Sequence, residues 1–121
     1  MANILVVDDA IFVRHTLKKI LEAYGHTMVG EADSGIMALK KYEELKPDVV
    51  LLDITMPGMN GTEVLVKLRA KDPKAKIIIC SSIGQQVVIA EAIQLGALDF
   101  IVKPFKEEQV IDAINKVLAK K

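Results

Sequence analysis

Charged and hydroxyl side chains directly follow four short β-rich runs of this 121-residue chain. They are Asp8 and Asp9 after residues 4–7, Asp53 after 49–52, Ser81 after 77–80 and Lys103 after 99–102. If these runs are parallel strands of one sheet, their carboxyl ends meet at the edge where open α/β sheets bind ligands. We therefore expect three carboxylates, a hydroxyl and an ammonium to converge at that edge.

Carboxylates that converge predict a bound cation. Two negative charges about 5 Å apart repel by roughly 3 kcal/mol at an effective dielectric constant near 20. Asp8, Asp9 and Asp53 would therefore destabilise the fold unless a cation lies among them. Ligands that offer only oxygen favour a hard divalent ion over zinc, and an ion that keeps open positions for phosphate oxygens is better described as Mg²⁺ than as Ca²⁺.

The same residues fit nucleophilic attack on phosphorus. A carboxylate beside Mg²⁺ can accept a phosphoryl group as an acyl phosphate, with Lys103 and Ser81 placed to meet the phosphoryl oxygens. Asp53 is the candidate phosphoacceptor, because it follows a central strand that fixes its direction. Each residue alone also has a structural interpretation. Asp9 could cap a helix and Asp53 could form a turn, while Ser81 and Lys103 could be ordinary surface groups.

The elements that position these side chains alternate between strand and helix. Runs 4–7, 49–52 and 77–80 are continuously apolar, as strands covered on both faces are, and are expected at the centre of a sheet. Runs 26–30 and 99–102 are more polar and are expected at its edges. Apolar residues at helical spacing predict a helix after each strand: Val13, Leu17, Ile20, Leu21 and Tyr24; Ala38, Tyr42 and Leu45; Leu65 and Leu68; Ile89 and Ile93; Val110, Ile111, Ile114, Val117 and Leu118.

Glycine and proline mark the expected helix ends. Gly25 and Gly96 stand where a helix stop favours a residue that accepts positive φ, and Pro47 and Pro73 follow helices that they cannot continue. The alternation predicts an α/β fold with a doubly wound parallel sheet.

Composition narrows the class of protein further. Sixteen basic and sixteen acidic residues give a formal net charge of zero, so nothing in the overall charge favours a nucleic acid or an anionic membrane as partner. Cys80 is the single cysteine and cannot form an internal disulfide, and no apolar run exceeds four residues. We expect a single domain over residues 1–121, located in the cytoplasm.

Three motifs in chain order resemble the response-regulator receiver domains. Residues 7–9 are similar to the acidic pair of that family, residues 53–61 to its phosphoacceptor loop, and residues 96–105 to its lysine segment. The resemblance covers essentially the whole chain. It implies a five-stranded parallel sheet in the order 2-1-3-4-5 with helices on both faces, the flavodoxin-like topology, and a chain with no output domain.

The resemblance also assigns roles to single residues. It implies that Asp53 accepts the phosphoryl group and that Mg²⁺ is held by Asp9, Asp53 and the backbone carbonyl of Thr55, with Asp8 helping through water. Ser81 and Lys103 would bind the phosphoryl oxygens. The bond between Lys103 and Pro104 is a candidate for a cis peptide.

Two positions depart from the pattern of the family. Ser81 stands where threonine is common and keeps the switching hydroxyl, whereas Phe100 stands where a switching tyrosine is common and has no hydroxyl to offer a partner. Phosphorylation of Asp53 is expected to draw in Ser81 and let Phe100 turn inward, which would alter the face formed by the fourth helix, fifth strand and fifth helix.

Within the family, the lack of an output domain and residues 80–86 resemble the single-domain chemotaxis regulators of the CheY type. This resemblance implies a chemotaxis histidine kinase as phosphoryl donor and a flagellar motor switch protein as output partner, with a phosphatase as a further partner and a monomeric chain. The chain would not be an enzyme beyond catalysing its own phosphorylation and dephosphorylation. The alternative is a single-domain phosphorelay intermediate that passes the phosphoryl group to a histidine phosphotransfer protein.

Two other classes fit the residues less well. A metabolic phosphotransferase that uses an aspartyl intermediate would need a second aspartate as general acid, and Thr55 occupies that position. A flavodoxin-like cofactor module would need a phosphate loop after the first strand, where Asp8 and Asp9 would repel phosphate.

Overall fold

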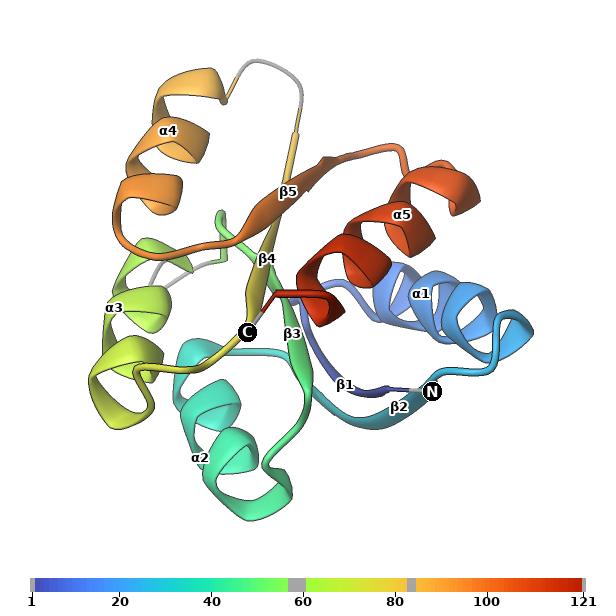
Figure 1. The fold of residues 1–121 in the computed structure, drawn as a ribbon, viewed down its shortest axis with the longest axis horizontal. Coiled ribbons are helices and arrows are strands. Elements are labelled where there is room, and N and C mark those ends of the chain that lie inside the picture. The colour runs from blue at the N-terminus through green and yellow to red at the C-terminus, as the bar shows by residue number, and fades with distance from the viewer. Residues whose placement is uncertain (1, 57–60, 83–84, 121) are drawn as a thin grey trace.

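The computed structural model describes residues 2–56, 61–82 and 85–120, in which five strands alternate with five helices (Figure 1). The strands are β1 (Asn3–Val7), β2 (Thr27–Ala32), β3 (Val49–Asp53), β4 (Ile77–Ser81) and β5 (Asp99–Val102). The helices are α1 (Ile11–Ala23), α2 (Gly35–Leu45), α3 (Gly61–Lys71), α4 (Gln86–Gln94) and α5 (Glu107–Leu118). The alternation predicted from the sequence is confirmed.

The strands form one parallel sheet in the order β2-β1-β3-β4-β5. This is the order that the resemblance implies, with the three apolar strands at the centre and the two more polar strands at the edges. Every residue of β3 and β4 is buried, as expected of strands covered on both faces. The order places β1 beside β3, so the residues that follow these two strands are neighbours in space.

Successive side chains of each strand enter two different core layers. In β1, Leu5 and Val7 belong to the layer under α2, α3 and α4, whereas Ile4 and Val6 belong to the layer under α1 and α5. Figure 1 shows these two groups of helices on opposite sides of the sheet. Because side chains alternate along a strand, continuous apolar runs are needed to fill both layers.

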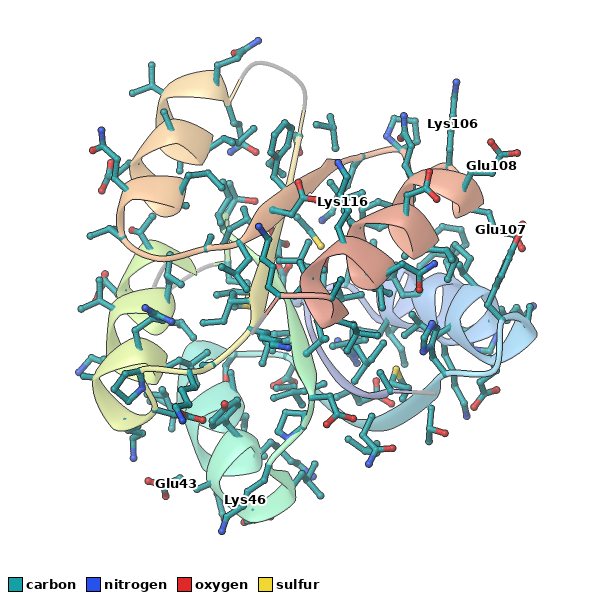
Figure 2. The ribbon with its side chains drawn as sticks, in the orientation of Figure 1. Glu43, Lys46, Lys106, Glu107, Glu108 and Lys116 are labelled. Carbon is teal, nitrogen blue, oxygen red and sulfur yellow. The ribbon has the colours of Figure 1, made fainter. Side chains whose placement is uncertain are left out.

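The helix ends follow local capping chemistry. The Ser34 hydroxyl oxygen accepts a hydrogen bond from the Met37 amide at 3.3 Å at the start of α2. Glu107 and Glu108 lie in the first turn of α5 and point outward (Figure 2), where acidic groups stabilise the positive end of the helix dipole. Among the described residues, none of the helices has the length and apolar character that crossing a membrane requires.

Both predicted glycine stops have positive φ, at +84° for Gly25 and +115° for Gly96. Gly96 also permits a close approach, because a Cβ atom there would lie 2.7 Å from Nε of Arg69. Lys46, which precedes Pro47, ends α2 in the left-handed region at φ +45°, although it is not a glycine. That ending could not be predicted from residue type.

Four strands have bounds that differ from the expected ones. β1 begins at Asn3, one residue earlier than expected. β2 covers 27–32 instead of 26–30, and its start is later because the backbone amide of buried His26 donates to the Leu21 carbonyl at the end of α1 at 3.0 Å. The Nδ1 atom of His26 accepts a further hydrogen bond from the Ala2 amide. β3 and β4 each run one residue further than expected, so Asp53 and Ser81 are the last residues of their strands. The sheet therefore fixes the backbone of both residues.

The apolar helix stripes are predicted too long at their ends. Tyr24, Leu45 and Ile93 are among the apolar residues whose helical spacing predicted the helices, but they are 46%, 38% and 42% exposed. Each lies in the last turn or at the C-terminal end of its helix, where less of the sheet remains to cover a side chain.

Candidate functional site

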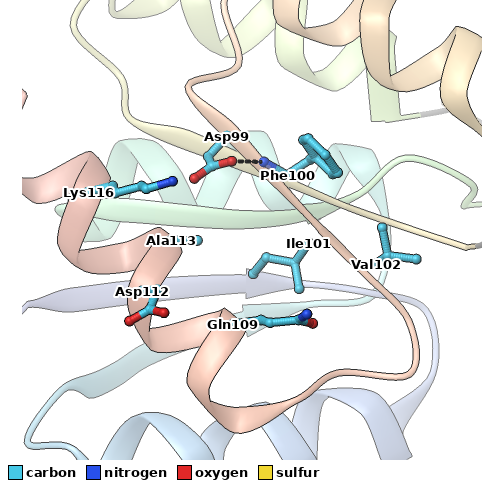
Figure 3. Close-up of a pocket in the computed structure, with 8 residues that line it drawn as sticks. All are labelled: Asp99, Phe100, Ile101, Val102, Gln109, Asp112, Ala113 and Lys116. Carbon is cyan, nitrogen blue, oxygen red and sulfur yellow. Dashed lines mark hydrogen bonds between the residues drawn. The ribbon is translucent and has the colours of Figure 1, made fainter.

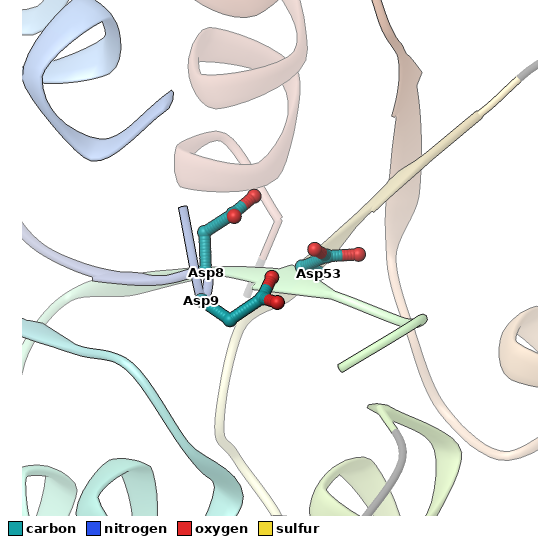
Figure 4. A group of neighbouring side chains, drawn as sticks. All are labelled: Asp8, Asp9 and Asp53. Atoms are coloured by element: carbon teal, nitrogen blue, oxygen red, sulfur yellow. The ribbon is translucent and has the colours of Figure 1, made fainter. Parts of the chain in front are cut away.

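The carboxyl ends of the parallel strands bring the predicted acidic residues together. Asp8 and Asp9 follow β1, and Asp53 ends the adjacent β3. One ligand atom from each carboxylate can be chosen so that all three lie within 4.8 Å of one another (Figure 4). The predicted convergence of the three aspartates is confirmed.

Lys103 joins this group from the turn after β5. Its Nζ donates hydrogen bonds to Oδ2 of Asp8 at 2.9 Å and to Oδ2 of Asp53 at 3.2 Å. Its own amide donates to the Ser81 carbonyl at 2.7 Å, and the Lys103–Pro104 peptide bond is cis. Lys103 is thus an ion-pair partner of two buried carboxylates and not a solvated surface charge.

The charges at the site perturb one another. Burial raises the pKa of Asp8, opposed by its hydrogen bonds from Lys103 and from the Ala10 amide, and the negative charge of Asp53 raises it further. Burial also acts against the charged form of Lys103, but the hydrogen bond to Asp8 and the charge of Asp53 outweigh it, so the pKa of Lys103 is raised. Three carboxylates and one ammonium leave a formal charge of −2, which a divalent cation would balance.

Thr55 contacts the carboxylate oxygen of Asp53 that Lys103 does not contact. Its backbone amide and its side-chain hydroxyl both donate to Oδ1 of Asp53, each at 3.0 Å. Asp53 is only 2% exposed, so these bonds and the ion pair with Lys103 fix both of its oxygens. The family resemblance implied a role for the Thr55 carbonyl as a metal ligand, which stays a prediction. The contact of the Thr55 hydroxyl with Asp53 was missed.

Ser81 carries a hydroxyl that lacks a partner among the described residues. The residue is 1% exposed, and its Oγ makes no hydrogen bond within that part of the chain. A buried hydroxyl without a partner lowers stability, so such a group calls for another explanation. A phosphoryl group on nearby Asp53 would offer it an acceptor.

Phe100 lies apart from the aspartates. It is on β5, beside Ile79 of β4, and is 44% exposed on the outer surface. The expectation that Ser81 and Phe100 stand on adjacent strands is confirmed. Phe100 is exposed in this structure, so the inward turn expected on phosphorylation stays a prediction.

At the β1–α1 turn the structure removes one structural alternative and adds one residue that the sequence analysis missed. Asp9 does not cap α1, because the cap position is Ala10 and no side chain among the described residues caps it. Arg14 was missed altogether, although its Nη1 donates to the Asp8 carbonyl at 2.7 Å and its Nε pairs with Glu31 at 2.5 Å. No motif or period marks an arginine whose acceptor is a backbone carbonyl.

The donor set fits a hard divalent cation. The group offers only carboxylate oxygens, with no histidine or cysteine among its members, and this set suits Mg²⁺ or Ca²⁺ better than zinc. Asp8 and Asp9, with Asp53, are the residues that would hold the ion. Asp53 belongs both to this group and to the ion pair with Lys103, so a metal and a phosphoryl group could meet there.

Comparisons with known proteins agree with this geometry. Residues 4–115 match the model of the response regulator receiver domain. The chain is 53% identical to the chemotaxis protein CheY of Thermotoga maritima, over 95% of this chain and 96% of that protein. It is 51% identical to CheY of Listeria monocytogenes, over 96% of this chain and 98% of that protein.

A solved structure shows the same fold. The structure resembles a crystal structure of the CheX–CheY–BeF3–Mg²⁺ complex of Borrelia burgdorferi, with a TM-score of 0.93 and 33% identity, covering 98% of this chain and 90% of that one. The fold is thus the flavodoxin-like fold of CheY-like receivers. With its family model, relatives and sheet order in agreement, the chain belongs to the response regulator receiver domain family, as a CheY-like member.

Proposed function

We propose that this chain is a phosphorylation switch whose acceptor is Asp53 and whose cofactor is Mg²⁺. The observation that carries the proposal is the position of Lys103, which contacts Asp53 and Asp8 together at the edge where the three aspartates converge. A cation that touches the acceptor carboxylate can also neutralise oxygens transferred to that carboxylate.

The reaction is transfer of a phosphoryl group from a phosphohistidine to Asp53. A carboxylate oxygen of Asp53 forms a bond to phosphorus, the phosphorus–nitrogen bond of the donor breaks, and the released imidazole nitrogen takes a proton. Bound Mg²⁺ would supply charge neutralisation at the phosphoryl oxygens. Thr55 orients Oδ1 of Asp53 through two hydrogen bonds, and Lys103 stays close to the other oxygen. The chain acts catalytically only on its own aspartate and is not a metabolic enzyme.

The donor protein would approach at the start of α1. Ile11 and Phe12 are 73% and 77% exposed there, directly after the turn that carries Asp9. Exposed large apolar side chains next to a polar site favour contact with another protein. We propose a histidine kinase of the chemotaxis type as that protein.

The switch would act through Ser81 and Phe100. The Ser81 hydroxyl has no hydrogen-bond partner in the described part of the chain, and the new phosphoryl oxygens would give it an acceptor. Movement of Ser81 would then make room for Phe100 on the adjacent strand to turn inward. Phe100 lines two adjoining grooves. One of about 460 Å³ is also lined by Ile89 and Val102. The other, of about 280 Å³, is also lined by Gln109 and Lys116 and is shown in Figure 3. Its rotation would reshape both grooves.

We propose that this surface of α4, β5 and α5 binds a flagellar motor switch protein, which makes the chain a cytoplasmic, monomeric chemotaxis regulator. The support is the likeness to several CheY proteins at about 50% identity over nearly their whole length. The alternative is a phosphorelay intermediate. It would use the same Asp53 chemistry but pass the phosphoryl group on to a histidine phosphotransfer protein.

One phosphotransfer experiment separates these two roles. The chain is phosphorylated by a chemotaxis kinase with labelled ATP, freed of the kinase, and divided between a motor switch peptide and a histidine phosphotransfer domain. A chemotaxis output predicts tighter binding of the peptide by the phosphorylated chain and little transfer of label. Rapid movement of the label to the phosphotransfer domain, without a gain in peptide affinity, contradicts the motor role.

Ser81→Ala tests the switch itself. This variant should still accept label on Asp53, but its phosphorylated form should bind the peptide no better than the unphosphorylated form. A phosphorylated variant with wild-type affinity for the peptide would show that the Ser81 hydroxyl does not couple the site to the output surface.

A further inference from the structure

We propose that Arg14 is a positioning residue of the Mg²⁺ site, which aims the carboxylate of Asp9 by holding the peptide group that precedes it. The inference rests on the proposed function, because it assigns the residue that prepares the metal site of that function. Arg14 acts through Asp9 and touches neither the metal nor the phosphoryl group.

The guanidinium of Arg14 bridges the β1–α1 turn and β2. Its Nη1 donates to the Asp8 carbonyl oxygen at 2.7 Å, and its Nε donates to Oε1 of Glu31 at 2.5 Å. The side chain is only 12% exposed, whereas that of Glu31 is 47% exposed. A charged donor in a largely buried setting makes a stronger hydrogen bond than a neutral one, so Arg14 restrains the carbonyl of Asp8 firmly.

The other two carboxylates of the site are held by their own contacts. Asp8 accepts hydrogen bonds from the Ala10 amide and from Lys103. Asp53 accepts them from Thr55 and from Lys103. Removing any single contact would leave each of these carboxylates with another.

Asp9 differs from both of them. It is exposed, and within residues 2–56, 61–82 and 85–120 its carboxylate forms neither a hydrogen bond nor an ion pair. Its direction toward Asp53 therefore depends on the backbone before it. This backbone is the peptide group between Asp8 and Asp9. Arg14 holds it through the hydrogen bond to the Asp8 carbonyl oxygen.

Charge and position predict opposite effects of losing Arg14. A cation near a metal site repels the metal, so by charge alone Arg14→Gln would bind Mg²⁺ more tightly, and Glu31→Gln, which removes an anion, would bind it more weakly. If Arg14 instead positions Asp9, Arg14→Gln weakens Mg²⁺ binding. Glu31→Gln then has little effect, because the bond from Arg14 to the Asp8 carbonyl stays in place.

The experiment is calorimetric titration of the full chain with Mg²⁺ alone, for the wild type and for Arg14→Gln, Arg14→Lys and Glu31→Gln. Loss of a partner that orients a metal ligand typically weakens metal affinity at least about tenfold, and we expect about this loss for Arg14→Gln. Glu31→Gln should stay within about twofold of the wild type, because its exposed charge is screened by salt. Arg14→Lys keeps the positive charge but not the planar guanidinium group, so its Mg²⁺ affinity should lie between those of Arg14→Gln and Glu31→Gln.

Thermal unfolding without Mg²⁺ shows which variants fold, and Arg14→Lys carries the test if Arg14→Gln does not fold. Wild-type Mg²⁺ affinity in a folded Arg14 variant overturns the inference. So does an equal loss in Arg14→Gln and Glu31→Gln, which would indicate a general structural effect. A wild-type chain that binds no Mg²⁺ overturns the proposed function itself and the role of Arg14 with it, and the wild-type titration alone distinguishes this case.

Discussion

Replacing Lys103 with methionine should destabilise the metal-free protein, because it removes the ion-pair partner of two buried carboxylates. Among the described residues, Lys103 is the only cation that contacts the carboxylates of Asp8 and Asp53, which are 1% and 2% exposed. Methionine preserves most of the length of the side chain and removes the ammonium. The variant therefore isolates the charge from the packing.

The magnitude follows from the two distances. At 2.9 Å and 3.2 Å, each attraction is roughly 5 to 6 kcal/mol at an effective dielectric constant near 20, before desolvation is subtracted. Removing one partner of a buried ion pair typically costs about 3–5 kcal/mol. Because the Lys103 side chain is 24% exposed, water reaches it, and we expect a loss near the lower end, about 3 kcal/mol.

The assay is urea denaturation at pH 7 in the presence of a chelator. With a slope of about 1.5–2 kcal/mol per molar urea, a loss of about 3 kcal/mol lowers the midpoint by roughly 1.5–2 M. Lys106→Met is the matched control, since Lys106 is exposed on the same connection to α5 and its loss changes the net charge equally (Figure 2). The control should shift by no more than about 0.5 kcal/mol. Equal midpoints for the two variants would refute the idea that Lys103 compensates buried charge.

The same variant makes a prediction about pH. Burial raises the pKa of Asp8 above its ordinary value even with Lys103 present, so ionised Asp8 lowers the stability of the fold. The contribution of Asp8 to stability is full below the pKa that it has in the unfolded chain. It is lost as the pH rises through the raised pKa that Asp8 has in the folded protein. The gap between Lys103→Met and the wild type should therefore narrow as the pH falls through that range, because a protonated Asp8 no longer needs the ammonium.

Three further predictions concern stability. Burial lowers the pKa of His26, so stability is full above pH 6.5 and falls as the pH drops toward the folded pKa; His26→Gln should flatten this slope in urea titrations, whereas His15→Gln, at an exposed position, should not. Tyr42→Phe removes a 2.8 Å hydrogen bond to Asp72 and should lower the unfolding free energy by about 1 kcal/mol, and an unchanged midpoint would contradict that bond. Ser81→Ala removes a buried hydroxyl without a partner in the described chain and should raise the urea midpoint, whereas a lower midpoint would point to a hydrogen bond of Oγ in the unphosphorylated state.

The fold was predictable because its main signals are local. Runs such as 49–52 and 77–80 are apolar at every position, and a strand in a parallel sheet covered on both faces requires this pattern. The residues after those runs were predictable for the same reason, since parallel strands end at one edge. The strand order itself came from the resemblance and was not contained in the periodicity.

The missed features depend on contacts between distant parts of the chain. Arg14 donates to a backbone carbonyl, an acceptor that any residue type provides. Its other partner, Glu31, lies on β2. His26 lies before β2, where its amide donates to Leu21 and its imidazole accepts a hydrogen bond from Ala2, 24 residues away. Such pairings carry no period and no motif, so they became visible only in the folded chain.

The most direct test of the account is the intact mass of the chain after incubation with acetyl phosphate or phosphoramidate, with and without Mg²⁺. The wild type should gain one phosphoryl group only when Mg²⁺ is present, and Asp53→Asn should gain none. A folded wild-type chain that binds Mg²⁺ yet gains no mass, or an Asp53→Asn variant that gains the same mass as the wild type, would contradict the assignment of Asp53 as the phosphoacceptor.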